Sequence, residues 1–461
     1  MYLNDTIAAV ATPKGIGGIA VVRVSGPMAF ECVAKVLRND AKKVVRGIQH
    51  ANAYDAKGEL IDEVIAIFMP LPHSYTKEDV VEIDCHGGLH ACEAILQALL
   101  EAGCRLALPG EFTKRAYVNG RLDLSQAEAV HELINAATSR ARKSAIEFLA
   151  GGSGTIFKEI KEDIMGILVS IEASIDFPSG DDEKIVDMSN AKVCKAVLDI
   201  LVKLDSAIEK AQEGAIVSKG IKIAISGAPN VGKSSLLNAL LGKNRSIVAD
   251  IPGTTRDTIE DAMSIKGIPI TLVDTAGIRQ SEDAIEKIGV DRAVCEVKDA
   301  DVVLFVLDSS RNIIEDDLTI SGLIPVGRSI VVLNKNDLSP AISCEEVKNI
   351  FLPSSLPYDF VSVSTVTGEG IFDLEEKIEG VITDKMLFEN QGFDISTRRL
   401  DCLKRTKNSL DEVVISVDSG VPVDIMCIDI RDALEAMGEL TGETAREDVI
   451  NQIFAKFCIG K

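Results

Sequence analysis

Residues 221–241, "IKIAISGAPNVGKSSLLNALL", decide the fold of the middle of the chain. They read as a buried strand, a glycine-rich turn and a helix, and residues 227–234 fit the pattern G-x-x-x-x-G-K-[ST]. The glycines let backbone N–H groups close around phosphates, and the helix N-terminus adds positive potential. In this pattern Lys233 contacts the β- and γ-phosphates, and Ser234 ligates Mg²⁺. The sequence therefore predicts a nucleoside triphosphate site.

Two motifs further along the chain are typical of the γ-phosphate side of such a site. "PGTTRD" at 252–257 offers Thr255 to complete the Mg²⁺ shell, and "LVDTAG" at 272–277 ends a strand in Asp274. Asp274 would hold Mg²⁺ through water, and the N–H of Gly277 would contact the γ-phosphate. Both motifs follow the glycine-rich turn in the order that a GTPase requires.

Two more motifs indicate which base is bound. "VVLNKND" at 331–337 ends another strand, and the Asp337 carboxylate can accept hydrogen bonds from N1–H and N2–H₂ of guanine, donors that adenine lacks. Asn334 would support the ring edge, and the Lys335 stem would lie on its face. In "SVSTVTGEG" at 362–370, the backbone of Ser364 and Thr365 would reach guanine O6. We expect GTP rather than ATP.

The residue that orients the attacking water is not where Ras-like proteins place it. They carry a Gln directly after DTAG, whereas this chain has Ile278 there. The polar group must come from elsewhere, and the nearby choices are Gln280, Glu282, Asp283 and Glu286.

Composition narrows the class of protein. The chain has 461 residues, which predicts about three domains, and its net charge of −22 disfavours tight, unaided binding to a polyanion. The start of the chain does not read as a signal peptide, and no apolar stretch is long enough to span a membrane. Ten cysteines are scattered singly, which argues against a zinc site and a disulfide framework and favours a reducing cytosol.

The periodicity of the apolar residues predicts a multidomain fold. We expect an α/β domain at 1–120, a helical segment at 121–217, an inserted α/β domain at 218–383 and a second helical segment at 384–461. The two helical segments would form one discontinuous domain. At the start of the first, Ser125 and Glu128 are expected to form a capping box.

Eight stretches along the chain, taken together, are more specific than the nucleotide motifs alone. With them the chain resembles the MnmE (TrmE) family of tRNA-modification GTPases over essentially its whole length. The stretches are "DTIAAVATPKGIGGIAVVRVSG" (5–26), "EDVVEIDCHGG" (78–88), "PGEFTKRAYVNGRLDLSQAEA" (109–129), "GAPNVGKSSLLNALL" (227–241), "DIPGTTRD" (250–257), "DTAGIR" (274–279), "LTGE" (440–443) and "IFAKFCIGK" (453–461).

The resemblance implies a homodimer built through an N-terminal folate-binding domain, with an inserted Ras-like P-loop GTPase domain. It implies that K⁺ takes the place of an arginine finger, held by Asn230, Ala249, Ile251 and Thr254, and that Glu286 is catalytic. The full set of implied GTP contacts is Asn230, Val231, Gly232, Lys233, Ser234, Ser235, Ala249, Asp250, Ile251, Pro252, Gly253, Thr254, Thr255, Asp274, Thr275, Ala276, Gly277, Asn334, Lys335, Asp337, Ser364 and Thr365.

The family is cytoplasmic and acts with a flavoprotein partner, MnmG (GidA), which carries FAD; the resemblance therefore implies a heterotetramer and tRNA as substrate. The pair adds a carboxymethylaminomethyl or aminomethyl group at C5 of the wobble uridine. A basic partner would also explain how so acidic a chain meets RNA. The implied site for 5-formyltetrahydrofolate, or a related tetrahydrofolate, consists of Arg23, Glu82, Arg121 and Lys461; many family members have Lys at position 121.

The terminal "FCIGK" raises a separate question about Cys458. As a prenylation box it is poor, because Gly460 is not aliphatic and Lys461 is outside the usual terminal set, so we expect no membrane anchor. One interpretation makes Cys458 a small buried thiol at the end of an amphipathic helix. The other, which the resemblance implies, places it beside the folate pocket, where it could assist the modification chemistry.

Other functions remain open at the level of the sequence. An Era-like ribosome-assembly GTPase would carry a KH-like module with a GXXG loop, which we do not find. A folate-dependent one-carbon transferase with a regulatory G domain would act without FAD or tRNA.

Overall fold

The structure is a computed structural model, and it divides the chain into two compact units. The first unit contains residues 1–131, 146–209 and 398–461, and the second contains 132–145 and 210–397. Both helical segments thus contribute to one unit, as a discontinuous domain requires. The residues that the structure describes are 5–13, 15–38, 46–176, 189–244, 260–274, 295–325, 327–343, 346–347, 359–383 and 395–461.

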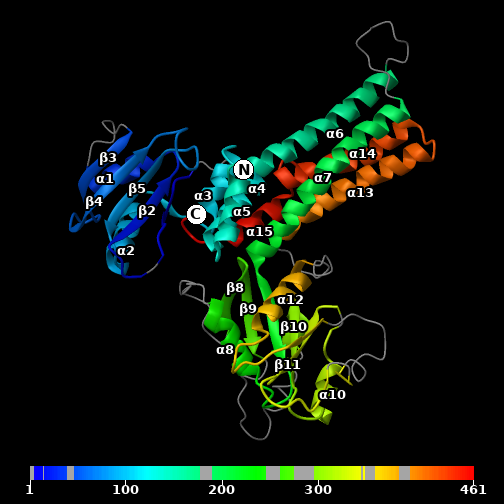
Figure 1. Cartoon of the computed structure of the whole chain (residues 1–461). Coiled ribbons are helices and arrows are strands. Elements are labelled where there is room, and N and C mark those ends of the chain that lie inside the picture. The colour runs from blue at the N-terminus through cyan, green and yellow to red at the C-terminus, as the bar shows by residue number, and fades with distance from the viewer. Residues whose placement is uncertain are drawn as a thin grey trace. The chain divides into compact units, whose positions relative to one another are not determined.

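The N-terminal part of the first unit is a sheet with helices on one face (Figure 1). The described strands pair in the order β3-β4-β5-β2-β1-β6, antiparallel except for the β1–β6 pair. The elements are β1 (Ile7–Val10), β2 (Ile19–Ser25), α1 (Ala29–Leu37), β3 (Gly47–Tyr54), β4 (Leu60–Met69), β5 (Val80–His86), α2 (Leu89–Glu101), β6 (Arg105–Leu106) and α3 (Glu111–Val118).

The two faces of this sheet have different roles. One face packs on α1 and α2 through a core that includes Val22, Phe68 and Ile95. On the opposite face, Ile7 and Ala9 pack with Phe112 of α3 and with Tyr75. The second face therefore leaves room beside α3 for the side chains of β2 and β5 that point the same way.

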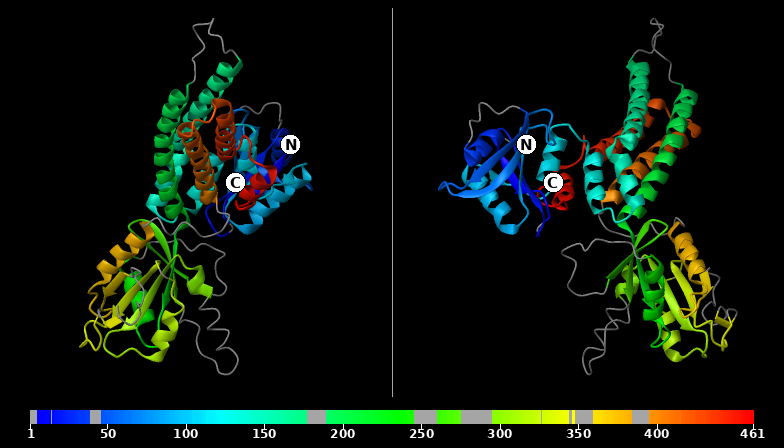
Figure 2. Two further views of the ribbon diagram at one scale, coloured as in Figure 1. Left: turned by 90° about the vertical axis from the view of Figure 1, so that its right-hand side faces the viewer. Right: turned by 60° about the vertical axis from the view of Figure 1, so that its left-hand side comes forward.

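Long helices form the rest of the first unit, and α6, α7, α13 and α14 run side by side in every view (Figures 1 and 2). Ion pairs connect them: Lys203 Nζ to Asp163 Oδ2 at 2.6 Å between α7 and α6, and Arg431 to Glu172 at 2.6 Å between α14 and α6. The helices are α4 (Leu124–Asn135), α5 (Ser139–Leu149), α6 (Gly152–Asp176), α7 (Asn190–Lys219), α13 (Ile395–Asp418), α14 (Val423–Thr441) and α15 (Glu447–Ala455).

The capping box predicted for Ser125 and Glu128 is wrong. Helix α4 begins at Leu124, and the Asp123 carboxylate accepts from the Gln126 amide at 2.7 Å while Gln126 Oε1 accepts from the Asp123 amide at 3.0 Å. The box lies two residues earlier because Asp123, not Ser125, precedes the first helical turn. Glu128 instead lies fully buried and accepts two hydrogen bonds from Arg398 of α13.

The second unit contains a sheet whose described strands follow the order β12-β11-β10-β7-β9-β8. All neighbours are parallel except β8 and β9, which form a hairpin. This is the arrangement of a Ras-like GTPase domain, so the predicted fold class is confirmed. The elements are β7 (Ile221–Ser226), α8 (Lys233–Asn244), β8 (Glu260–Ile265), β9 (Ile268–Asp274), β10 (Val302–Asp308), α10 (Glu315–Ser321), β11 (Ser329–Asn334), β12 (Asp359–Ser362) and α12 (Ile371–Thr383).

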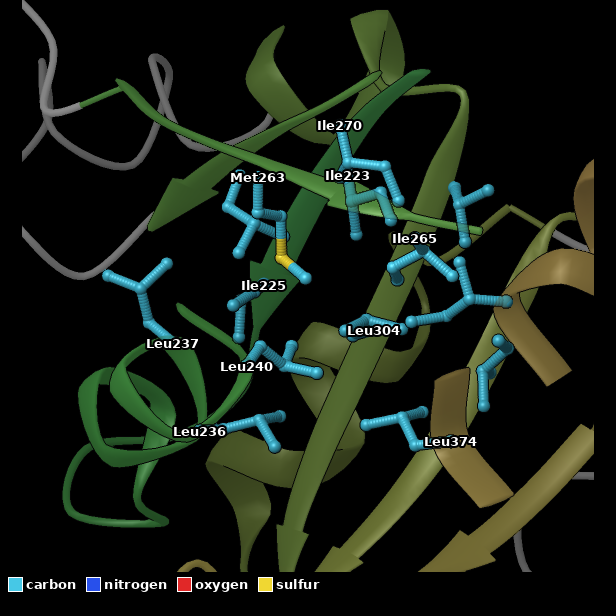
Figure 3. Close-up of a cluster of buried hydrophobic side chains, with 14 of the residues drawn as sticks. Ile223, Ile225, Leu236, Leu237, Leu240, Met263, Ile265, Ile270, Leu304 and Leu374 are labelled. Atoms are coloured by element: carbon cyan, nitrogen blue, oxygen red, sulfur yellow. The ribbon is translucent and has the colours of Figure 1, made fainter. Parts of the chain in front are cut away.

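A large apolar cluster fixes the hairpin against the helix that follows the glycine-rich turn. Met263 and Ile265 of β8 and Ile270 of β9 belong to the same cluster as Leu236 and Leu240 of α8 (Figure 3). Because this core is continuous, the hairpin and α8 are held as one body. Among the described helices of either unit, none has the length and apolar character that crossing a membrane would need.

Candidate functional site

The glycine-rich turn joins β7 to α8 and keeps Lys233 inside its own loop. Lys233 Nζ donates to the carbonyl oxygens of Gly227 and Ala228, both at 2.8 Å, and its side chain is buried. The ammonium is thus placed among backbone groups at the start of α8, where the helix dipole favours an anion. Ser234 and Ser235 follow in the first turn, and both are exposed.

The backbone of Asn230 lies in the left-handed region, with φ of 63°. Asn is one of the few side chains that adopt this conformation readily. Asn230 can therefore serve in two ways: its backbone shapes the loop, and its exposed side-chain amide offers an oxygen to a cation.

Asn334 ties the phosphate loop to the guanine-reading loops. Its side chain is fully buried; Nδ2 donates to the Val231 carbonyl at 2.9 Å, and Oδ1 accepts from the Thr365 amide at 3.4 Å. A side chain at Gly232 would put its Cβ 2.2 Å from Asn334 Nδ2, so only glycine fits there. The sequence placed Asn334 near the base but did not predict that it joins the two loops.

Asp337 and Ser364 meet at the end of β11, as the motifs require. Ser364 Oγ donates to Asp337 Oδ1 at 2.6 Å, and the Thr367 amide donates to Ser364 Oγ at 3.1 Å. This hydroxyl fixes one oxygen of the exposed Asp337 carboxylate, which sets the orientation of the other.

Asp308 is a member of the site that the motifs did not include. Lys335 Nζ contacts Asp308 Oδ2 at 2.6 Å, across the ends of β11 and β10. Burial would raise the pKa of Asp308, but hydrogen bonds from Lys335 and Ser310 lower it below its usual range. The pair holds the Lys335 stem in place. The sequence feature that could have revealed Asp308 is a carboxylate at the end of an apolar strand.

The loops on the γ-phosphate side lie outside the described residues. The structure describes the backbone of Asp274 at the end of β9, but not its side chain. The other predicted positions outside the described residues are Ala249, Asp250, Ile251, Pro252, Gly253, Thr254, Thr255, Thr275, Ala276, Gly277, Gln280, Glu282, Asp283 and Glu286, so their roles stay predictions.

A second polar site lies on the first unit, on the sheet face opposite α1 and α2. Arg23 of β2 donates to Glu82 of β5, with Nε–Oε1 of 2.8 Å, and to the carbonyl of Gly460 at 3.1 Å. The guanidinium of Arg121 lies 4.7 Å above the Tyr75 ring, and that of Arg23 lies 5.5 Å from the same ring. Tyr75 thus joins the four residues of the predicted folate site, although nothing in the sequence singled it out.

The C-terminal tail completes this site. A side chain at Gly460, where φ is 95°, would put its Cβ 2.4 Å from the Val10 carbonyl, so the tail lies directly against β1. Burial and the neighbouring Arg23 charge lower the pKa of Lys461. The structure therefore brings Arg23, Glu82 and Lys461 together, with Arg121 reaching them through Tyr75.

The prediction that Cys458 is a buried thiol is wrong. Cys458 is exposed, whereas Phe454 and Phe457 are the buried side chains of this segment. The helix ends at Ala455, and the chain then turns, with the Cys458 carbonyl accepting from the Gly110 amide at 3.4 Å. The thiol points away from the apolar contact because it no longer follows the helical period. Each of the nine cysteines that the structure describes is free.

Comparisons with known proteins agree over both units. The family model for the GTP-binding protein TrmE N-terminus matches residues 6–121, and that for the MnmE helical domain matches residues 124–458. The G domain of the T. maritima FeoB iron transporter is a solved structure that is 31% identical, covering 35% of this chain and 98% of that chain, with a TM-score of 0.26.

Curated relatives match the chain from end to end. The tRNA modification GTPase MnmE of Thermoanaerobacter sp. (strain X514) is 43% identical over 465 residues, 99% of each chain. That of Carboxydothermus hydrogenoformans is 43% identical over 467 residues, 100% of each chain. With both family models in chain order and relatives that match over the full length, the chain belongs to the MnmE family of tRNA modification GTPases.

Proposed function

We propose that this chain is a potassium-activated GTPase which, with a flavoprotein partner, modifies C5 of the wobble uridine of certain tRNAs. The relatives' shared name, tRNA modification GTPase, supports the substrate. The observation that carries the GTPase part is Asn334, whose buried amide joins the phosphate loop to the guanine loop. That contact makes base recognition and phosphate binding one rigid site.

The residues of the phosphate loop fit the two cations of the proposal. Ser234 and Thr255 offer hydroxyl oxygens, which Mg²⁺ prefers, and Mg²⁺ would neutralise charge between the phosphates. Asn230 offers an amide oxygen at the top of the loop, and with Ala249, Ile251 and Thr254 would hold K⁺. K⁺ would supply positive charge opposite the negative charge that develops on the transferred phosphoryl group in the transition state. Glu286 then orients the attacking water in place of the missing Gln.

Potassium dependence is the first test. Turnover in potassium chloride should exceed turnover in sodium chloride at equal ionic strength. Asn230→Ala and Asn230→Gly should both lose this response, and Asn230→Gly keeps the left-handed backbone that Asn230 adopts. If Asn230→Gly retains the potassium response, the side chain only shapes the loop and the cation role is refuted.

Glu286 gives the second test. Glu286→Ala should lower GTP turnover roughly 10²–10⁴-fold, since it removes a group that positions water, while GTP affinity stays nearly constant. The matched control is Glu282→Ala, four residues earlier in the sequence. A larger loss of GTP turnover in Glu282→Ala would mean that Glu282, and not Glu286, orients the attacking water.

The first unit supplies the folate part of the proposal. Arg23, Arg121 and Lys461 offer cationic donors to the carboxylates and carbonyl groups of 5-formyltetrahydrofolate, and Tyr75 offers a ring face. The folate would supply the one-carbon unit, and FAD on the partner the redox step. The exposed Cys458 lies in the tail that ends in this site, where it could assist the modification.

The proposal includes a cytoplasmic homodimer whose G domains close around the transition state of hydrolysis and drive a change in the heterotetramer with the flavoprotein. A distance measurement between labelled G domains should shorten with GDP, aluminium fluoride and potassium. If the distance does not shorten, potassium acts within one subunit.

Nucleoside analysis of tRNA from a strain lacking the chain is the decisive experiment. Unmodified wobble uridine is expected, and a normal nucleoside profile would refute the tRNA function.

A further inference from the structure

A short segment of the first helical region belongs with the GTPase domain. Residues 132–145 fall in the second unit, although they precede the phosphate loop by more than eighty positions. Ala141 of α5 is only 4% exposed and is a member of the same apolar cluster as Ile265 and Leu240, and Ala136 packs against that cluster. The start of α5 is therefore part of the GTPase core.

The contact is made at the turn of the β8–β9 hairpin. Thr138 Oγ1 donates to the carbonyl of Gly267 at 2.7 Å, and accepts from the Ala141 amide at 3.1 Å. One hydroxyl thus caps the first turn of α5 and holds the hairpin turn. The backbone approach is close: a Cβ at Gly267, where φ is 84°, would lie 3.1 Å from the Cβ of Arg140.

The other end of the hairpin reaches the nucleotide loops. β8 begins at Glu260, five residues after Thr255 in sequence, and residues 249–255 are predicted to contact the γ-phosphate and its cations. β9 ends at Asp274, the first residue of the DTAG motif. The pairing runs without a shift from Glu260↔Val273 to Ile265↔Ile268. A displacement at the open end therefore reaches the turn without being absorbed by a bulge.

Helix α5 continues into the core of the first unit. Near its C-terminus, the Phe148 ring lies 6.4 Å from that of Phe157 in α6, and the Arg399 guanidinium of α13 lies 4.2 Å above it. The helix runs unbroken from Ser139 to Leu149. Helix α5 thus begins on the hairpin of the GTPase core, and Phe148 near its other end packs within the first unit.

We propose that Thr138 is a positioning residue that couples the nucleotide state of the GTPase domain to the first turn of α5, through its hydrogen bond to Gly267. A displacement of the hairpin on a change of nucleotide shifts this turn, because the Thr138 hydroxyl bonds to both. The inference goes beyond GTP hydrolysis, and rests on the proposed function only in that residues 249–255 and 275–277 contact the nucleotide. Thr138 itself contacts neither nucleotide nor cation.

The test uses the full chain and compares hydrogen exchange of the amides of residues 139–149 with GDP and with a non-hydrolysable GTP analogue. In the wild type, exchange should differ roughly threefold to tenfold between the two states, the range expected for one hydrogen bond. Thr138→Val keeps the shape but removes the hydroxyl, and should abolish the difference. Thr138→Ser keeps the hydroxyl and should restore it.

Two further measurements separate coupling from damage. GTP turnover of Thr138→Val should stay within about twofold of the wild type, since nucleotide contacts are intact. Gly267→Ala changes the other partner of the hydrogen bond, because the added Cβ forces the turn away from Arg140. It should also reduce the exchange difference. Lys266→Ala, which removes only the neighbouring exposed ion pair with Glu379, should leave it unchanged.

The proposal is overturned if the exchange difference is absent in the wild type with analogue bound, or persists in both Thr138→Val and Gly267→Ala. Failure of the proposed function looks different: the wild type would then show no GTP turnover, which is measured separately. A folding defect in Thr138→Val would show as faster exchange across α8 in both nucleotide states. Gly267→Ala then decides the outcome.

Discussion

The two sheets of this protein hold their sites in different ways. In the GTPase domain, β10 and β11 are parallel and buried at every residue, and the nucleotide loops follow their carboxyl ends. In the N-terminal domain, β3 and β4 are antiparallel; β4 buries every second residue from Val64 to Phe68, and β3 is largely exposed. A sheet buried on both faces has only its strand ends for binding, whereas a sheet with one open face can bind across that face.

This difference changes which part of the chain builds each site. The phosphate loop binds largely through backbone groups, which one short motif arranges. The N-terminal site depends on side chains brought together from β2, β5 and the tail, and the Arg23–Gly460 contact spans 437 positions in sequence. Changes in the first site should therefore act on ligand binding alone, and changes around the second should also act on stability.

The largest expected effect is on guanine recognition. Asp337→Asn replaces two acceptors for the guanine N–H groups by one acceptor and a donor, and GTP affinity should fall roughly 10²–10⁴-fold. Stability should be unchanged because Asp337 is exposed. Fluorescence titration with a labelled GTP measures the affinity. Asp316→Asn, an exposed carboxylate of α10 in the same domain, is the control; equal losses in the two variants would contradict a base-reading role.

The next largest effect concerns the buried ion network beside the N-terminal site. Arg115 is fully buried and contacts Asp5, Glu78 and Glu111 at 2.7, 3.2 and 3.1 Å. Arg115→Met would remove the Arg115 partner of Glu78 and leave the buried Glu111 carboxylate with Arg105 alone, so the free energy of unfolding of this domain should fall by about 3–5 kcal/mol. Hydrogen exchange of the β1 and α3 amides in the full chain measures this change in the free energy of unfolding.

Arg105 serves as the control for this change, because it contacts Asp5 and Glu111 but is 41% exposed. Arg105→Met should have a clearly smaller effect on the same amides. GTP turnover should be normal in both variants. A loss of turnover in Arg115→Met would mean that the two domains are not independent in stability.

Acid should destabilise the same network. Burial would raise the pKa of Asp5 and of Glu111, but hydrogen bonds from Arg105 and Arg115 lower both pKa values below their usual 3.8 and 4.5. A lowered pKa stabilises the fold above the unfolded value, and that stabilisation is lost as the pH falls through the folded one. Protection of the β1 amides against hydrogen exchange should therefore decline below about pH 4.5. Glu111→Gln should flatten this decline, and an unchanged profile would contradict the assignment.

The smallest effect is expected at Arg121. Its guanidinium lies over the face of Tyr75, and Lys also carries a charge but stacks less well. Arg121→Lys should weaken binding of 5-formyltetrahydrofolate by about twofold to fivefold in calorimetry, the value of one cation–π contact. A loss above tenfold would show that Arg121 binds the ligand by a bidentate contact instead.

Several features of the fold were predictable because they depend on neighbours in sequence. The strand at 221–226 and the helix after the glycine-rich turn follow from periodicity and from one motif. Strand β3 is hard to detect by alternation, because Ala53 is its one buried residue at an exposed edge of the sheet. The prediction misplaced the cap of α4, where two polar residues two positions apart compete for the same role.

The sequence by itself determined the family and the order of its domains, and it predicts the loops that bind GTP. Each of these is written in stretches of a few residues, because backbone phosphate and base contacts are arranged within a single turn. Only the tertiary structure decided that Tyr75 joins Arg23 and Arg121, that Glu128 pairs with Arg398, and that Thr138 holds Gly267. Such contacts join side chains tens to hundreds of positions apart, and their partners are chosen by how whole helices and sheets pack.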